Sequence, residues 1–464
     1  MSFASVTFLL LLAVTVPLYW ALPWQRARLV LLFVASLVFY GFRHWPSVFL
    51  LLFTITLNYV LALRIEATHL RARRRGWLLA GVVVNLGLLA YFKYAAFLAG
   101  ALVDLARLLG FELSVPPMGS FLPLGISFFT FQVMAYLVDV WRGDLKAERS
   151  ILVFAVFKSF LAQLVAGPIV KGKHLFPQLR EKRAFDPSQL HRGTFLLVAG
   201  LGLKLAVADV LRPFVDQVYA APRDASTLEA WLSLYGYSVQ LFADFWGYST
   251  VAVGVGLLFG LELPVNFEAP YLATSAQEFW RRWHVTLSRW FRDYLYIPLG
   301  GNRHHEWRNR LVTMTLAGLW HGPAWTFVLW GLGHGLWLSV EQALARKRPE
   351  APPPGRVRKV LKALFVFHGV SALWVLFRAP TLRGALEVYG RLVLPPFTSR
   401  EFLPPQWPVW LVGFVALYPF LDELVRGGRF LRLEVRWQLV VSALLLWLMA
   451  AYAGPPADFV YFVF

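Results

Sequence analysis

The chain has no cysteine among its 464 residues. That absence excludes disulfides, thiolate nucleophiles, cysteine-linked lipids and zinc sites with thiolate ligands. The sequence also has no HExxH string, no G-x-S-x-G elbow, no Walker loop and no Rossmann fingerprint. A zinc site, a serine hydrolase and an ATPase therefore have no support, and we expect no metal. Any chemistry must use histidine, carboxylate, hydroxyl or amide side chains.

Charged residues are scarce as well: they make up 15% of the chain, whereas hydrophobic residues make up 58%. Soluble proteins average nearer a quarter charged residues. The composition therefore predicts an all-α polytopic integral membrane protein, with roughly ten or more transmembrane helices plus re-entrant or interfacial ones.

Acidic residues are few, with 26 Asp and Glu against 45 Lys and Arg, which gives a net charge of +19. In a soluble protein this excess would suggest nucleic acid as a partner. Here the basic residues lie mainly between apolar runs, as cytoplasmic loops require. We therefore expect the charge to set orientation in lipid, with no nucleic acid, and we place the cluster at 71–75 in the cytoplasm.

The apolar runs divide the chain into expected regions. Residues 3–22 have no basic residue ahead of them and no convincing cleavage site, so we expect a retained span. Residues 157–183 break at Gly167-Pro168, which favours a re-entrant or interfacial piece, and another span is expected at 410–424. We expect one membrane domain over 1–464, with N-terminal helices in 1–150, a catalytic core in 151–345 and C-terminal helices in 346–464.

His321 lies in the middle of the apolar run 311–340 and is followed at once by Gly322 and Pro323. That pair interrupts a helix and leaves backbone groups free near the ring. Basic residues flank the run on both sides, so two helices hinged here would enter and leave on the same face. An imidazole at membrane depth predicts a functional site, and the alternative is a capping or packing histidine at a hairpin turn.

Residues 264–310 are rich in arginine and tryptophan. Phe279, Trp283, Leu287 and Trp290 recur at helical spacing, which predicts one face of an interfacial helix. The same composition would suit an anionic ligand such as a phosphate. Candidate donor-binding residues are Arg281, Arg282 and Arg289.

Other polar residues in apolar surroundings are also candidates. His284 is either catalytic or an interfacial histidine among arginines. Asp244 must face protein or a cavity, where it either pairs with an arginine of another helix or orients the base. We expect His334 to pack and the pair His304-His305 to be solvated.

Acyl transfer from a thioester to a hydroxyl needs a base for the hydroxyl proton, and a neutral imidazole suits that role near pH 7. Trp320, Trp325 and Trp330 would surround His321 with an apolar wall that keeps water from a thioester. A transporter with His321 as a proton relay is a different hypothesis, although the chain lacks the internal repeat that many transporters show.

Several strings together resemble the membrane-bound O-acyltransferase family, and within it the bacterial alginate O-acetyltransferase branch. They are Asp244-Phe245-Trp246-Gly247-Tyr248-Ser249, Asn266-Phe267 with Pro270-Tyr271, Phe279-Trp280-Arg281-Arg282-Trp283-His284, Tyr294 to Gly300, and Leu319-Trp320-His321-Gly322. The resemblance covers nearly the whole chain.

The resemblance implies a ring of helices around a thin core pierced by a tunnel, in the inner (plasma) membrane. It implies that His321 is the essential histidine and His284 the second one, with Asp244, Asn266 and Trp320 as orienting or tunnel residues. The donor would be a cytoplasmic thioester, acetyl-CoA or an acyl carrier, and no cofactor would be bound. The acceptor would be the hydroxyls of an exported polysaccharide, with a periplasmic acetyltransferase partner. D-alanyl transfer to teichoic acid remains an alternative.

Overall fold

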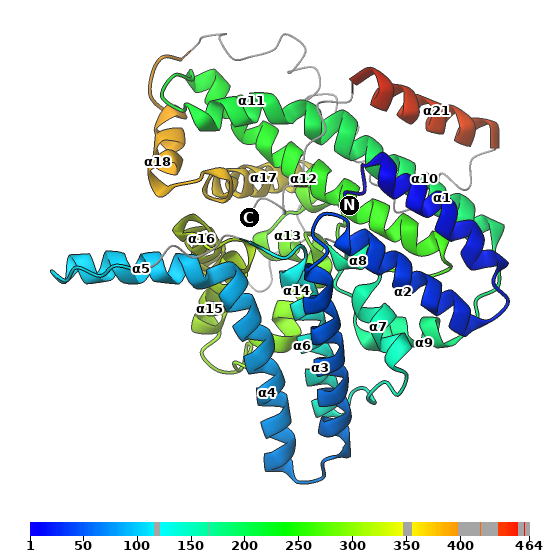
Figure 1. Cartoon of the computed structure of the whole chain (residues 1–464). Coiled ribbons are helices and arrows are strands. Elements are labelled where there is room, and N and C mark those ends of the chain that lie inside the picture. Colours follow the sequence, from blue (N-terminus) through cyan, green and yellow to red (C-terminus); the bar gives the residue numbers. More distant parts are fainter. Residues whose placement is uncertain are drawn as a thin grey trace. The chain divides into compact units, whose positions relative to one another are not determined.

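The computed structural model describes residues 1–115, 121–165, 167–346, 355–397, 418, 435–452 and 459. The regular secondary structure of these residues is helical (Figure 1), as the sequence predicts. Contacts group the chain into two units, one formed by residues 1–193 with 255–264 and the other by 194–254 with 265–464. The expected single membrane domain with three sequential parts stays a prediction.

The first unit is built from helices of the N-terminal region. They are α1 (Val6–Ala21), α2 (Gln25–Gly41), α3 (Ser47–Ala67), α4 (Arg71–Leu89), α5 (Ala95–Leu108), α6 (Ile126–Arg142), α7 (Ile151–Ser159), α8 (Leu161–Leu164) and α9 (Gly172–Arg180). A buried amide pair joins α3 to α4, because Asn85 Nδ2 donates to Asn58 Oδ1 at 2.7 Å. The three helices α7, α8 and α9 are each too short to cross about 30 Å of hydrocarbon, which agrees with the re-entrant or interfacial piece expected there.

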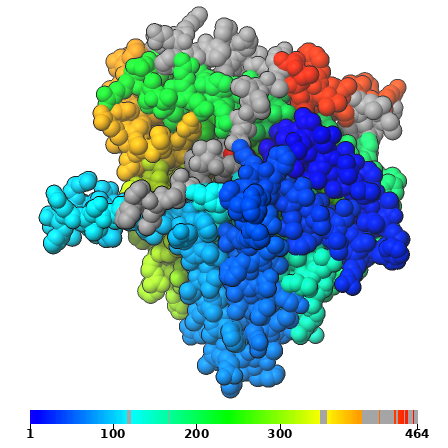
Figure 2. Space-filling model, viewed as in Figure 1, coloured from blue at the N-terminus to red at the C-terminus, as the bar shows by residue number. Residues whose placement is uncertain are grey.

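A π-helical turn at Ala90–Tyr94 separates α4 from α5. The chain changes direction there, and α5 extends away from α3 and α4 (Figures 1 and 2). π-turns are a known cause of helix kinks. The helical stretch from Arg71 to Leu108 is therefore bent.

The second unit holds most of the remaining helices. They are the greater part of α10 (Pro187–Leu203), the π-turn η2 (Lys204–Ala208), α11 (Asp209–Ala220), most of α12 (Thr227–Leu258), the 3-10 turn η3 (Pro270–Leu272), α13 (Ala276–Arg282), α14 (Val285–Phe291), the π-turn η4 (Arg292–Tyr296), α15 (Glu306–His321), α16 (Trp325–Arg346), α17 (Arg356–Arg378), α18 (Leu382–Arg391) and α21 (Val435–Tyr452).

Five helical stretches in the described residues are long and apolar enough to cross a membrane. They are Ser47–Ala67, Arg71–Leu108, Pro187–Ala220, Thr227–Leu258 and Arg356–Arg378. The higher count of ten or more crossings stays a prediction. The span expected at 410–424 lies outside the described residues.

A buried charge cluster joins α10 and α11 to α12. Lys204 Nζ lies 2.6 Å from Asp209 Oδ1 and 2.9 Å from Asp244 Oδ1, and all three side chains are buried. The helices approach closely because Gly200 and Gly247 face each other's carbonyl oxygens, as small residues permit. The charged partner of Asp244 in this cluster is a lysine, whereas one of the two alternatives from the sequence was pairing with an arginine.

α15 and α16 form a tight antiparallel hairpin. A Cβ at Gly331 would collide with the carbonyl oxygen of Met314, and one at Gly318 with that of Phe327. At the open end Arg346 pairs with Glu306 at 2.5 Å, so the hairpin begins and ends on the same side. This confirms the hinge and the shared side that the two basic flanks predicted.

We expect Gly331→Ala to destabilise the protein by about 1–3 kcal/mol, because the added methyl group forces the two backbones apart. The matched control is Gly76→Ala in α4, where an added Cβ meets nothing within 4 Å. There we expect no loss, or a gain of up to about 1 kcal/mol from helix propensity. Thermal unfolding of the purified protein measures both, and equal melting temperatures for the two variants would contradict the close packing.

We expect Lys204→Met to cost about 3–5 kcal/mol, because it leaves two buried carboxylates without their shared cation. The triple variant Lys204→Met/Asp209→Asn/Asp244→Asn removes every charge of the cluster and should recover part of that loss. Thermal unfolding again provides the measurement. A triple variant less stable than the single one would argue against charge imbalance as the cause.

Candidate active site

His321 is the last residue of α15, and its side chain is 3% exposed. Gly322 leaves the helix in extended conformation, Pro323 follows, and α16 starts at Trp325. The helix therefore breaks where the Gly-Pro pair predicted. This break holds the imidazole at the closed end of the hairpin.

Aromatic rings surround the imidazole of His321. Their centroids lie 4.9 Å away for Trp320, 5.2 Å for Trp330 and 5.1 Å for Phe377, all with ring planes near perpendicular. The expected apolar wall is present, but its residues differ from the prediction. Trp325 is 53% exposed, and Phe377 of α17, which was not predicted, lies against the ring instead. No local sequence signal marks Phe377, because it lies 56 residues further along the chain (377 − 321).

His284 lies between α13 and α14 with φ of 41°, in the left-handed region that non-glycine residues rarely adopt. Hydrogen bonds on both sides hold this backbone: the amide of Glu268 donates to the carbonyl of Arg282 at 3.0 Å, and that of Val285 donates to the carbonyl of Asn266 at 2.9 Å. The side chain of Asn266 also accepts from the hydroxyl of Thr286 at 2.7 Å. Asn266 therefore positions the histidine through the backbone.

The break at His284 corrects the continuous interfacial helix that the sequence suggested. Ser275 caps α13 and accepts from the amide of Glu278 at 3.0 Å, and the helix ends at Arg282. The expected apolar stripe is buried throughout, but it is divided between α13, the turn and α14. Its residues face protein.

The ring of His284 is fully buried, 4.6 Å from the Phe245 ring and 6.1 Å from that of Trp320. His284 lies outside the five candidate spans, and burial lowers its pKa to about 3. Its imidazole is therefore neutral at physiological pH. Trp320 contacts both histidine rings and so links them within one cluster.

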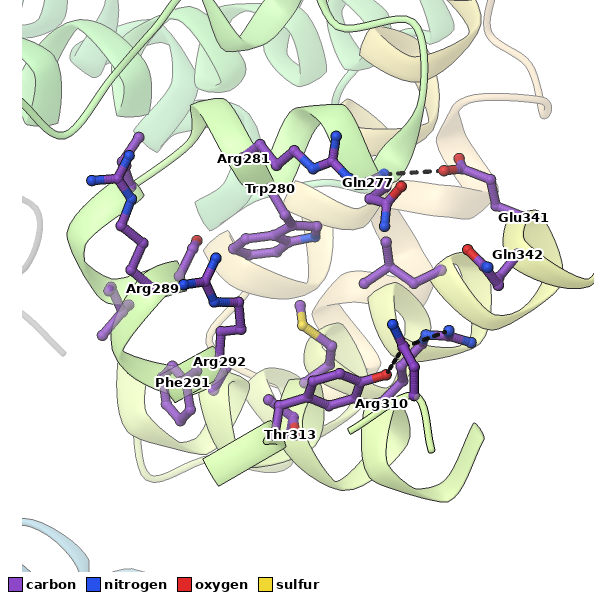
Figure 3. A pocket seen from close by; sticks show the side chains of 18 of the residues that line it. Gln277, Trp280, Arg281, Arg289, Phe291, Arg292, Arg310, Thr313, Glu341 and Gln342 are labelled. Atoms are coloured by element: carbon purple, nitrogen blue, oxygen red, sulfur yellow. Dashed lines mark hydrogen bonds between the residues drawn. The ribbon is translucent and has the colours of Figure 1, made fainter. Parts of the chain in front are cut away.

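A cavity of about 650 Å³ lies beside this cluster (Figure 3). His321 is one of its lining residues. Four arginines line it: Arg281, Arg289, Arg292 and Arg310. Along α15 the lining residues are Arg310, Thr313, Met314, Ala317 and His321, which share one helical face. Arg310 and His321 are eleven residues apart in one helix, so about 16 Å of helix separates these two lining residues.

The arginines differ in their partners. Arg310 pairs with Glu306 at 3.2 Å, and Arg292 with Asp293 at 2.9 Å. Within the described residues Arg281 and Arg289 have no ion pair, so their guanidinium groups can receive an anion. Arg282 is not in the cavity wall, because it bonds to Glu278 and to the carbonyl of Ala269.

The two carboxylates of the cavity wall are Glu268 and Glu341. Glu341 accepts from the backbone amides of Ala276 at 2.7 Å and Gln277 at 3.1 Å, at the start of α13 (Figure 3). These bonds fasten α16 to α13 across the cavity. The four arginines outnumber the two carboxylates, so the wall keeps a positive charge that favours an anionic ligand.

The structure thus brings His321, His284, Trp320 and Asn266 into one region, with Arg281 and Arg289 in the adjoining cavity. Asp244 is directed to Lys204, while its neighbour Phe245 contacts His284. His334 is buried and accepts a hydrogen bond from Trp280 Nε1 at 3.3 Å, which agrees with packing, and His304 and His305 are exposed. Across the described residues no group of three His, Asp or Glu could hold a metal ion.

Comparison with known proteins identifies the family. The model of MBOAT, the membrane-bound O-acyltransferase family, matches residues 145–379. The chain is 41% identical to the probable alginate O-acetylase AlgI of Pseudomonas aeruginosa, over 84% of this chain and 74% of that protein. It is 38% identical to a peptidoglycan O-acetyltransferase of Helicobacter pylori, over 78% and 73%, and 27% identical to a teichoic acid D-alanyltransferase of Bacillus subtilis, over 56% and 70%.

The matched segment contains both histidines, the charge cluster and the arginine-lined cavity. The five candidate spans agree with a multi-pass membrane protein. The chain therefore belongs to the membrane-bound O-acyltransferase family and is an O-acyltransferase.

Proposed function

We propose that the protein transfers an acetyl group from a cytoplasmic thioester to hydroxyl groups of an exported polysaccharide, with His321 as the general base. One observation carries the proposal: His321 lies in the wall of a cavity that four arginines also line. A thioester donor with phosphate groups needs both features, because its phosphates bind cations and its acyl carbon must reach a base.

In the proposed step the imidazole nitrogen of His321 takes the proton of the acceptor hydroxyl. The hydroxyl oxygen then attacks the thioester carbon, the C–O bond forms and the C–S bond breaks. The proton passes from the imidazolium to the departing thiolate, so the overall reaction consumes and releases no proton. A positioned base of this kind typically contributes about 10²–10⁴-fold in rate.

The aromatic surroundings of His321 support this role. Rings about 5 Å away on three sides keep water from the imidazole, which protects a thioester from hydrolysis. His284 stays neutral because its pKa is lowered to about 3, so it adds no positive charge near the base. A transporter that used His321 as a proton relay would not need an arginine-lined cavity beside it. The family of the chain is also one of acyltransferases.

The donor in this proposal is a phosphopantetheine thioester, either acetyl-CoA or an acylated carrier protein. Arg281 and Arg289 bind its phosphates, since they have no ion pair in the described part of the chain. The relatives named for alginate and peptidoglycan O-acetylation support an envelope or exported polysaccharide as acceptor. We place the protein in the inner membrane, with an extracytoplasmic acetyltransferase as partner.

A second candidate is D-alanyl transfer to an envelope polymer, because the teichoic acid D-alanyltransferases are also similar to this chain. Mass spectrometry of the surface polymers separates the two reactions, since acetyl and alanyl esters differ in mass. The higher identity to the O-acetylases favours acetyl transfer.

Replacing His321 with Ala should lower polysaccharide acetylation by about 10²–10⁴-fold, because the general base is lost. Ester content of the surface glycan measures the effect, and immunodetection of the protein in membranes controls for accumulation. His304→Ala, in an exposed position, is the matched control and should retain activity. Full acetylation by the His321 variant would falsify the assignment.

Replacing Arg281 with Gln should raise the KM for acetyl-CoA about tenfold, with a smaller change in kcat, because one charge-assisted phosphate contact is lost. Arg303→Gln, in an exposed loop and outside the cavity wall, should leave the KM unchanged. Release of the free thiol measures turnover without interference from the protein, which has no cysteine. Equal KM values for both variants would remove Arg281 from the donor site.

A further inference from the structure

Two glutamines line the cavity, Gln277 of α13 and Gln342 of α16. Figure 3 shows both on the same side of the cavity as Glu341. Gln277 is exposed and Gln342 is partly exposed, so both side chains are accessible to solvent. Neither side-chain amide bonds to another group within the residues that the structure describes. Two accessible amides in a cavity wall are therefore free to bind a ligand.

The register of the α15–α16 hairpin gives the order of the lining residues. A Cβ at Gly335 would lie 3.2 Å from the Cα of Leu311, so the adjacent Arg310 lies level with this part of α16. Gln342 is seven residues further towards the open end, which is about 10 Å of helix. From the closed end outwards the order is therefore His321, Arg310 and Gln342.

Two hydrogen bonds show how α13 lies along α16. The backbone amide of Gln277 donates to Glu341 Oε1 at 3.1 Å, whereas Trp280 Nε1 donates to His334 Nδ1 at 3.3 Å. The start of α13 therefore lies towards the open end of the hairpin and its last turn towards the closed end. Because Gln342 follows Glu341 directly, both glutamines line the part of the cavity near the open end.

We infer that the amides of Gln277 and Gln342 bind the adenine base of the donor, so that the donor is acetyl-CoA and not an acylated carrier protein. This inference rests on the proposed function. In coenzyme A the base lies beyond the phosphates, at the far end from the thiol. A donor with its thioester at His321 and its phosphates at the arginines therefore extends its base towards the glutamines.

The chemistry of an amide fits the edge of adenine. A glutamine side chain presents a carbonyl oxygen beside an N–H group, and adenine presents an amino group beside a ring nitrogen that accepts. The two can form a pair of hydrogen bonds, as glutamine does with adenine in DNA. The arm of a carrier protein ends at a phosphate attached to the protein and has no base. The glutamines therefore distinguish two donors that share the same thioester arm.

Equilibrium binding to the full-length purified protein tests the inference. The probes are coenzyme A and an analogue that keeps its ribose and all its phosphates but lacks the base. Gln277→Leu and Gln342→Leu should each weaken coenzyme A about fivefold and leave the analogue unchanged, because each removes hydrogen bonds to the base. Arg281→Gln should weaken both probes. Gln217→Leu, at an exposed position of α11 outside the cavity wall, is the matched control and should change neither.

Three results would overturn the inference. The first is unchanged binding of coenzyme A by either leucine variant of the cavity glutamines. The second is an equal loss for both probes, which would indicate a structural role. The third is tighter binding of a phosphopantetheinylated carrier protein than of coenzyme A by the wild type. Failure of the proposed function is recognised separately, because it appears as continued acetylation by His321→Ala.

Discussion

The contact between the backbones of α15 and α16 is the constraint on which the candidate site depends. Gly318 and Gly331 carry no side chain, so the two helices touch along the hairpin. That contact, together with the break after His321, determines where the imidazole lies. The same hairpin supplies the lining face from Arg310 to His321, so the cavity takes its length and direction from a single rigid helix.

Three of the buried polar groups lie where the backbone departs from a regular helix. Lys204 begins a π-turn, His284 has a positive φ, and His321 stands at a helix end. Neighbouring groups stabilise each irregularity. They are the two carboxylates at Lys204, the hydrogen-bonded segment around Asn266 at His284, and the α15–α16 hairpin at His321. Such local strain is maintained only where the surrounding structure determines it, and it is often found at functional sites.

The sequence predicted those features that a local signal marks. Gly322-Pro323 interrupts the helix, so the hinge at His321 could be read directly. The anionic ligand that the dense arginines indicate stays a prediction. The break at His284 could not be read, because no glycine or proline marks it. Hydrogen bonds that involve Asn266 and Glu268, which are distant in the sequence, stabilise it. Phe377 and Lys204 were missed for a related reason: their importance comes from partners on other helices.

The different roles proposed for the two histidines rest on their different surroundings. His284 has no exposed surface and a pKa near 3, so its charge does not change over the physiological range. His321 is also shielded, but it borders the cavity, so a bound molecule can reach its ring. The proposed reaction moves one proton from a hydroxyl to a thiolate. It needs one imidazole whose charge can change, and neighbouring groups whose charge stays constant. Trp320 contacts both rings, so it lies between the proposed base and the second histidine.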